Sequence, residues 1–127
     1  MFAIDTNILI YAHNKGSKFH KKASIFVNDK VSKRDKNGEY VTGIPSQVFV
    51  EFINVITRST IENPLSLEKA VEVVEKYLKA GIPAIHPRFT QLTTFLELAK
   101  STTTRRKTFD LFLAATLKDN SVPDTFH

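Results

Sequence analysis

The stretch FAIDTNILIYA (residues 2–12) sets one acid, Asp5, between two apolar runs. The first run predicts a short buried strand over residues 2–4, and the second predicts a helix with Thr6 or Asn7 as its N-cap. In parallel α/β sheets, ligand sites collect at the carboxyl ends of the strands. Because Asp5 stands at such an end, we expect it either to contribute to a site or simply to favour the N-terminus of the helix through the helix dipole.

The alternation of apolar strands and helices continues along the chain. We expect helices over 17–27, from 45 or 46 to 56, and over 66–80, 89–99 and 109–119, strands over 40–42 and 83–85, and the start of a strand over 122–127. Ser66 and Thr108 are the expected N-caps of two helices, and Gly81 is an expected C-terminal stop. The polar run 29–40 predicts a solvated loop. Short strands separated by helices imply parallel pairing and an α/β sandwich.

The length and composition of the chain are those of one ordinary globular domain. Its 127 residues fit a single domain, and 42% apolar and 24% charged residues are typical of soluble proteins. The absence of cysteine excludes disulfides, thiolate catalysis and cysteine-based zinc sites. No apolar stretch approaches the roughly 20 residues that span a bilayer, so we expect a cytoplasmic protein with no membrane partner. The net charge of +5 mildly favours a polyanion such as RNA or DNA.

A second acid, Glu51, belongs to a predicted helix that is apolar almost all round. At about 100° per residue, the polar residues of this helix gather into one narrow stripe formed by Gln47, Glu51, Asn54 and Arg58. A stripe of this kind faces solvent on a mostly buried helix, or it forms the wall of a cleft. The pattern leaves both interpretations open.

A third acid, Asp110, shares the apolar face of its predicted helix with Leu113, Ala114 and Leu117. An acid on a buried face is costly unless it is paired, protonated or bound to a metal ion. The alternative is an acid in the first helical turn, which the helix dipole favours. The first interpretation predicts a functional role for Asp110, and the second does not.

If both acids are functional, Glu51 and Asp110 join Asp5 at the carboxyl ends of the strands. Clustered carboxylates repel one another, so they need a cation to stay ionised at neutral pH. Ligation by oxygen alone suits hard ions such as Mg²⁺ or Mn²⁺. An ion held there can polarise a phosphoryl oxygen and activate water, so the acids predict metal-dependent hydrolysis of phosphodiesters.

The segments that carry these acids resemble the motifs of PIN domains, and most closely those of VapC-type toxins. The opening FAIDTNILIYA resembles the first strand and turn of the family. The segment IPSQVFVEFINVITR (44–58) resembles the VapC helix that carries the second acid, and TFDLFLAATLKDN (108–120) resembles the helix that carries the third. The matches follow the order of the family along essentially the whole chain. The resemblance implies one domain over 1–127, a three-layer sandwich with a short parallel sheet flanked by helices.

The resemblance also implies a site and an activity. It implies that Asp5, Glu51 and Asp110 bind Mg²⁺ (or Mn²⁺), that Thr6 supports the first acid, and that Asn54 lies beside the second. It further implies hydrolysis of RNA, a protein antitoxin as partner, and homodimers. Relative to the family pattern, the chain lacks the last strand and helix, and a fourth acid with them.

Two further groups of residues indicate a function less strongly than the three acids do. Arg105, Arg106 and Lys107 precede the Asp110 helix, where they either contact RNA phosphates or form a solvated linker. His13 and His20 have no zinc-ligand spacing, so we interpret them as surface or helix-packing residues.

Two functions therefore remain in competition. The first is a divalent-metal-dependent endoribonuclease, the toxin of a toxin–antitoxin pair, which the acids favour. The second is a catalytically impaired PIN-fold relic or binding module that still pairs with an antitoxin, which the shortened C-terminus favours. A nuclease directed at DNA would use the same chemistry as the first.

Overall fold

A short parallel sheet forms the centre of the computed structural model, which describes residues 1–102 and 108–126. The strands are β1 (Phe2–Ile4), β2 (Thr42–Pro45), β3 (Ala84–Ile85) and β4 (Asp124–Phe126), in the order β3-β2-β1-β4. The paired strands all run parallel, as the sequence predicts. Ala3 of β1 is in register with Gly43 on one side and with Thr125 on the other. β1 is therefore an inner strand, and Asp5 follows it.

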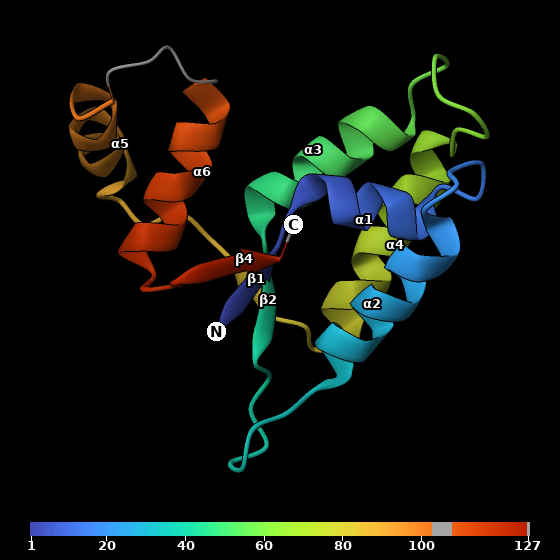
Figure 1. Cartoon of the computed structure of the whole chain (residues 1–127), viewed down its shortest axis with the longest axis horizontal. Coiled ribbons are helices and arrows are strands. Elements are labelled where there is room, and N and C mark those ends of the chain that lie inside the picture. Colours follow the sequence, from blue (N-terminus) through green and yellow to red (C-terminus); the bar gives the residue numbers. More distant parts are fainter. Residues whose placement is uncertain (103–107, 127) are drawn as a thin grey trace.

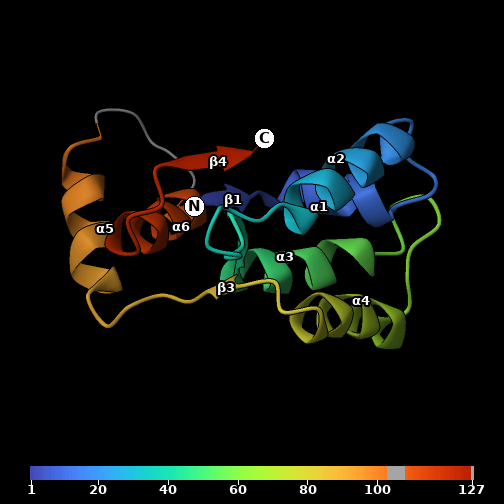
Figure 2. The ribbon, with the colours of Figure 1, turned by 90° about the horizontal axis from the view of Figure 1, so that it is seen from below.

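Helices cover both faces of this sheet. They are α1 (Thr6–His13), α2 (His20–Ser32), α3 (Ser46–Ile56), α4 (Leu67–Lys79), α5 (Gln91–Lys100) and α6 (Thr108–Asp119). Figures 1 and 2 show α1 to α4 on one side of the sheet and the α5–α6 pair on the other. This arrangement confirms the expected three-layer α/β sandwich.

The main core lies between the sheet and helices α1 to α4. Ile4 and Ile44 enter it from the strands and Leu9, Phe52 and Ile56 from the helices, and all are fully buried. Burying one side chain of this size contributes roughly 1.5–3 kcal/mol. The core therefore fixes the relative positions of α1 and α3, the helices that follow β1 and β2.

The α5–α6 pair packs more loosely against the rest of the molecule. Within the described residues α5 has no buried side chain, and its Phe95 meets Phe112 of α6 in a T-shaped contact at 5.6 Å. Asp119 ties the two helices further, because it accepts hydrogen bonds from the hydroxyls of Thr90 and Thr94 at 2.9 and 2.6 Å. The two helices thus form one unit beside the sheet.

The structure corrects the predicted position of β2. We expected a strand over 40–42, yet β2 spans Thr42–Pro45 and is buried throughout. Gly43 and Pro45 are poor strand formers, but pairing with β1 and β3 outweighs their local preference. The ring of Tyr40 instead lies 3.7 Å from the Arg34 guanidinium, outside the sheet.

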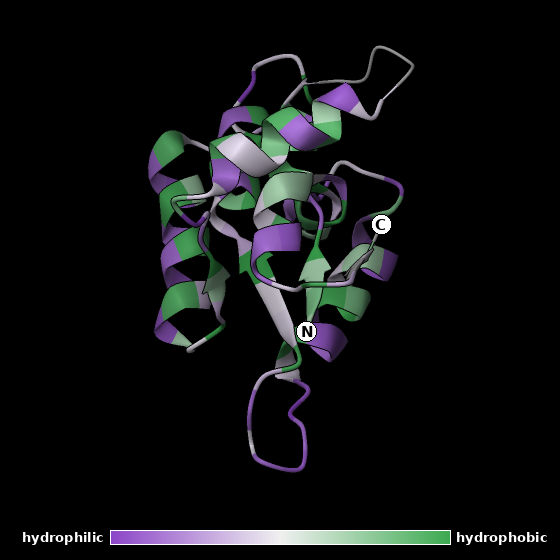
Figure 3. Ribbon diagram, turned by 90° about the vertical axis from the view of Figure 1, so that its left-hand side faces the viewer, coloured by the Kyte–Doolittle hydropathy of each residue, from purple (hydrophilic) through white to green (hydrophobic). Residues whose placement is uncertain are grey.

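Helix α2 also differs from its prediction, because it begins three residues later and continues to Ser32. Ser17 delays the start, since its hydroxyl accepts a hydrogen bond from the Phe19 amide at 3.1 Å. At the other end Asp29 and Lys33 form an i,i+4 ion pair at 3.4 Å, which supports the extra turn. The loop after Ser32 is hydrophilic, as expected, and protrudes below the sheet (Figure 3).

The remaining helices match their predicted ranges closely. Ser66 caps α4 by accepting a hydrogen bond from the Lys69 amide, and Gly81 ends it with a positive φ of 87°. A residue with a side chain would be strained there, which explains the stop. Among the helices in the described part of the chain, none has both the length and the apolar character needed to cross a bilayer.

Candidate active site

Asp5 caps α1 at the carboxyl end of β1. Its Oδ1 accepts a hydrogen bond from the Ile8 amide at 3.0 Å, and its own amide donates to the Phe126 carbonyl of β4 at 3.1 Å. The expected N-cap, Thr6 or Asn7, was therefore wrong by one or two residues. The carboxylate caps the N-terminus of α1 and also lines the cleft described below. Asp5 can therefore both favour the N-terminus of α1 and contribute to a site, the two alternatives that the sequence left open.

Glu51 lies half-buried on α3, with both carboxylate oxygens engaged. Oε2 accepts a hydrogen bond from the Thr6 hydroxyl at 2.7 Å, and Oε1 accepts one from the Gln47 side-chain amide at 3.0 Å. We expected Thr6 to support Asp5, whereas its hydroxyl donates to Glu51. Each oxygen of an ionised carboxylate has a second acceptor position, so the two bonds orient Glu51 and leave it able to bind a cation.

Asp110 lies in the first turn of α6, where it is exposed. Of the two interpretations of this residue, the costly buried acid is wrong, and the acid of the first helical turn is the one that the structure has. The same helix end is tied to α3, since the Gln47 amide also donates to the carbonyl of Phe109 at 3.0 Å. Gln47 therefore connects the second acid to the turn that carries the third.

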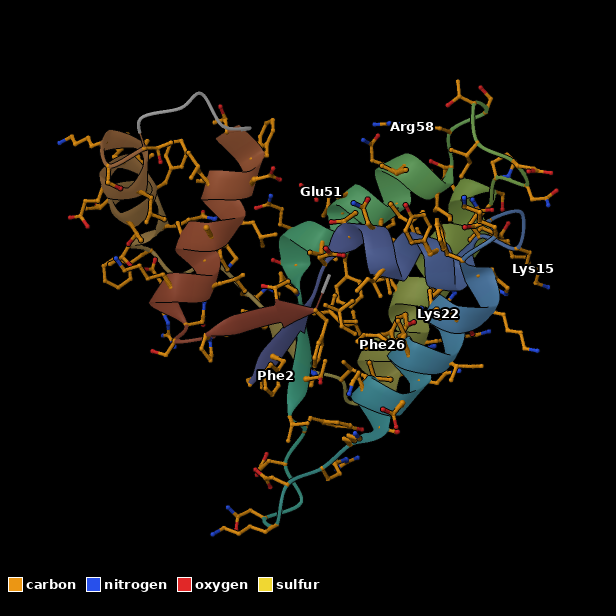
Figure 4. All side chains as sticks on the ribbon, in the orientation of Figure 1. Phe2, Lys15, Lys22, Phe26, Glu51 and Arg58 are labelled. Carbon is orange, nitrogen blue, oxygen red and sulfur yellow. The ribbon has the colours of Figure 1, made fainter. Side chains whose placement is uncertain are left out.

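One cleft of about 790 Å³, which we call the acid cleft, lies between α1, α3 and α6. Asp5, Glu51 and Asp110 all line it. Gln47, Glu51 and Asn54 of the predicted polar stripe form one wall of the cleft on α3, and Arg58, two residues past the end of this helix, also lines the cleft. Figure 4 shows Glu51 on α3 and Arg58 beyond the far end of this helix. Of the two interpretations of this stripe, the cleft wall is the one that the structure supports.

The chemistry of this cleft fits a hard divalent cation. The three carboxylates come from three separate elements and present only oxygen, the ligand type that Mg²⁺ and Mn²⁺ prefer. Within residues 1–102 and 108–126, however, no group of three acids or histidines is drawn close enough to hold an ion as the side chains stand. Asp110 is exposed, so its side chain has room to approach the other two.

The structure adds two residues that sequence reasoning did not assign to the site. Arg58 is the only cation among the described residues that line the acid cleft. Gln47 orients Glu51 and holds the Phe109 carbonyl. Both belong to the predicted polar stripe, so the extent of this stripe was the signal that pointed to them. Arg105, Arg106 and Lys107, the expected phosphate-contacting residues, lie outside the described residues.

The fold is an α/β domain with helices on both faces of a parallel sheet and a cleft lined by acids beside the carboxyl end of β1. The PIN domain family model matches residues 2–123, which is nearly the whole chain. The chain therefore belongs to the PIN domain family.

Comparison with solved structures supports the same fold. The chain is similar to Mycobacterium tuberculosis VapC20, described as a toxin that cleaves the sarcin–ricin loop, with a TM-score of 0.70 and 15% identity over 98% of this chain and 87% of that one. It is also similar to a chain of FitAB bound to a DNA fragment, with a TM-score of 0.61 and 14% identity over 98% and 82%. A search of curated protein sequences gives no match.

Proposed function

We propose that this chain is a divalent-metal-dependent endoribonuclease, the toxin component of a toxin–antitoxin pair. The observation that carries the proposal is the cleft at the carboxyl end of β1, lined by Asp5, Glu51 and Asp110 from three elements. Membership of the PIN domain family supports a nuclease, because PIN domains are generally nucleases. The fold shared with a toxin that cleaves RNA supports RNA as the substrate.

Asp5, Glu51 and Asp110 are the residues that would hold Mg²⁺ or Mn²⁺. Such an ion, when bound, polarises a phosphoryl oxygen and lowers the pKa of a bound water. The residues of the chain do the positioning. Thr6 and Gln47 hold Glu51 through its two oxygens, and the helix cap holds Asp5. Because Glu51 and Asp5 are held before substrate arrives, the reorganisation that remains is the approach of the Asp110 side chain to these two acids.

Arg58 is suited to bind the substrate phosphate. It lies two residues past the end of α3 and seven residues after Glu51, and it lines the same cleft as that acid. Its guanidinium can form two parallel hydrogen bonds with phosphate oxygens. Asn54 stands between the two residues on the same wall and offers an amide to the RNA backbone.

The decisive experiment combines cleavage with metal binding. Labelled RNA and labelled single-stranded DNA are incubated with the protein in Mg²⁺, Mn²⁺ or EDTA, and Mn²⁺ affinity is measured separately by calorimetry. We expect RNA to be cut only with a metal ion, and Asp5→Asn and Asp110→Asn to lose both cleavage and Mn²⁺ affinity. Preferred cutting of DNA would show a DNA-directed nuclease.

The competing function is a catalytically impaired PIN-fold relic or binding module that still pairs with an antitoxin. The spacing of the acids favours it, because no three acids or histidines of the described chain are close enough to hold an ion in this conformation. Failure of both Mn²⁺ binding and RNA cleavage in the wild type would establish this alternative. Mn²⁺ binding without cleavage would point to a missing catalytic group instead.

The proposed partners are an RNA substrate, a protein antitoxin and a second copy of the chain, in the cytoplasm. A homodimer is supported by the apolar surface beside α5, where Phe89 is fully exposed and Leu92 and Leu96 are about half exposed or more. Apolar patches of this kind mark contact surfaces in soluble proteins. Analytical ultracentrifugation of the wild type and of Leu92→Glu tests the dimer.

A further inference from the structure

A second hollow, which we call the aromatic groove, lies on the other side of α1 from the acid cleft. It has a volume of about 590 Å³ between α1 and α2, and its walls include Tyr11, Phe19 and Phe26. Asp5 and Asn7 line both this groove and the acid cleft. The first turn of α1 therefore lies between two neighbouring hollows, and a ligand that crosses this turn can enter both.

The aromatic rings of the groove are open to solvent and held in place by their neighbours. Tyr11 and Phe19 are 36% and 45% exposed, and their ring centroids lie 5.1 Å apart. Deeper in the groove, Phe26 packs edge-on against Phe126 at 5.3 Å. Exposed rings of fixed orientation offer faces on which a planar group can stack.

Lysine side chains lie at the part of the groove that is farther from the acid cleft. Lys22 lines the groove, and the ammonium of Lys18 lies 5.1 Å from the centre of the Phe19 ring. Lys22 stands one turn before Phe26 on α2, and Figure 4 shows the two residues close together. Asp5 is the only acid among the described residues that line the groove. Basic and aromatic side chains together are the usual surface for single-stranded nucleic acid.

We propose that the aromatic groove binds an unpaired nucleotide of the RNA strand whose scissile phosphate lies in the acid cleft. This inference rests on the proposed ribonuclease function. The base stacks on Tyr11 and Phe19, and Lys22 contacts a phosphate of the same strand. The backbone crosses the first turn of α1 past Asn7, which lines both hollows.

Two observations favour a nucleotide over a protein segment in this groove. The groove shares Asp5 and Asn7 with a cleft whose chemistry suits a phosphate bound with a cation, so one strand that passes over this turn can occupy both. Its rim carries lysines, which attract phosphate. The groove then selects single-stranded RNA, because bases within a duplex are already stacked and cannot enter it.

The test measures binding without cleavage. A short fluorescein-labelled single-stranded RNA of random sequence is titrated by fluorescence anisotropy in EDTA at low ionic strength, and duplex RNA is used for comparison. The test variants are Phe19→Leu, which removes the ring but keeps an apolar side chain, and Lys22→Gln. Their matched controls on α2 are Ile25→Ala and Lys21→Gln, because both residues are exposed and neither lines the groove.

We expect Phe19→Leu to weaken single-strand binding about tenfold and to leave duplex binding unchanged. Lys22→Gln should weaken binding several-fold more than Lys21→Gln, although both remove one charge. Single-strand affinity that Phe19→Leu leaves unchanged would overturn the inference and leave the groove to a protein partner. If the variants behave as expected but Mn²⁺ brings no cleavage by the wild type, the proposed enzymatic function fails while the nucleotide site stands.

Discussion

Gln47 of α3 donates a hydrogen bond from its side-chain amide to the backbone carbonyl of Phe109 on α6, at 3.0 Å. The same nitrogen donates to Oε1 of Glu51, also at 3.0 Å. One side chain thus orients the second acid and holds the helical turn that carries Asp110. Because no described residue of α5 is buried and the buried residues of α6, Ala115 and Thr116, lie more than one turn after Asp110, this bond bears directly on where the third acid lies.

Replacing Gln47 by Leu should therefore impair catalysis more than folding. Hydrogen bonds to charged groups contribute about 1.5–3 kcal/mol, so we expect kcat/KM for RNA cleavage to fall by at least tenfold. The thermal midpoint should change little, because Gln47 is only partly buried. Full activity of Gln47→Leu would show that α6 is placed without this contact.

Substitutions of Asp5 should separate its two roles. Asp5→Asn keeps a good N-cap and removes the charge, so cleavage and Mn²⁺ affinity should be lost while stability without metal is unchanged or higher. Asp5→Ala also removes the cap of α1, and should cost about 1 kcal/mol of unfolding free energy. Urea denaturation of both variants in EDTA measures the difference. An Asp5→Asn protein that is much less stable would indicate a mainly structural acid.

The Thr6 hydroxyl should matter through Glu51. Thr6→Val keeps the shape of the side chain but cannot donate to Oε2, so the carboxylate loses one of its two orienting bonds. We expect about a tenfold lower kcat/KM, weaker Mn²⁺ binding and near-normal stability. Thr6→Ser restores the donor and should restore most of the activity. Equal loss in both variants would show that the methyl group, rather than the hydroxyl, is required.

The buried His13 predicts a pH-dependent stability. Burial and then repulsion by His20 lower the pKa of His13 from 6.5 to about 4. Nε2 of the neutral ring and the Tyr77 hydroxyl share a hydrogen bond of 2.6 Å, and burial raises the pKa of Tyr77 to about 12. His13 is thus a helix-packing residue, one of the two alternatives predicted.

The sign of the effect follows from the lowered pKa. Below about pH 6.5 the unfolded chain binds a proton on His13, whereas the folded chain does so only near pH 4. The contribution of His13 to the free energy of unfolding is therefore complete above pH 6.5 and is lost as pH falls toward 4. The loss is on the order of 3 kcal/mol. Urea denaturation across this range should show a flatter profile for His13→Phe. His20→Gln is the control and should retain most of the slope.

Phe126 should anchor β4, and through it Asp5. Its ring stacks on Phe2 at 5.1 Å and meets Phe26 at 5.3 Å, and its carbonyl accepts the Asp5 amide. Phe126→Ala should lower the unfolding free energy by about 2 kcal/mol, less than for a fully buried ring. Phe89→Ala is a matched control, because Phe89 is fully exposed. Equal stability of both variants would contradict this role for β4.

Most of the fold could be predicted because local signals and burial agree. The apolar run of residues 2–4, the Ser66 cap and the Gly81 stop each specify an element boundary, and the structure has them as expected. The prediction was wrong for β2, where buried pairing with both neighbours selects Gly43 and Pro45 over the more strand-like residues before them. No local preference encodes that choice.

In the candidate site, too, local patterns could be predicted from the sequence and contacts between separate elements could not. Periodicity was enough to identify Glu51 and the polar stripe around it, since the stripe is a property of one helix. The exposure of Asp110 and the pairing of Thr6 with Glu51 depend on how separate elements pack. The Thr6–Glu51 hydrogen bond joins residues 45 positions apart, so neither composition nor spacing could predict it.

The amino-acid order alone settled that this is a parallel α/β chain with an acid at the end of its first strand, because strand and helix periods and their caps are local. Tertiary packing decided which groups share a cleft. It brought Gln47 against Phe109, set the Thr6 hydroxyl on Glu51, and left two hollows that share the first turn of α1. Such contacts form only when the buried faces of several helices meet one sheet, and that meeting minimises exposed apolar surface over the whole chain.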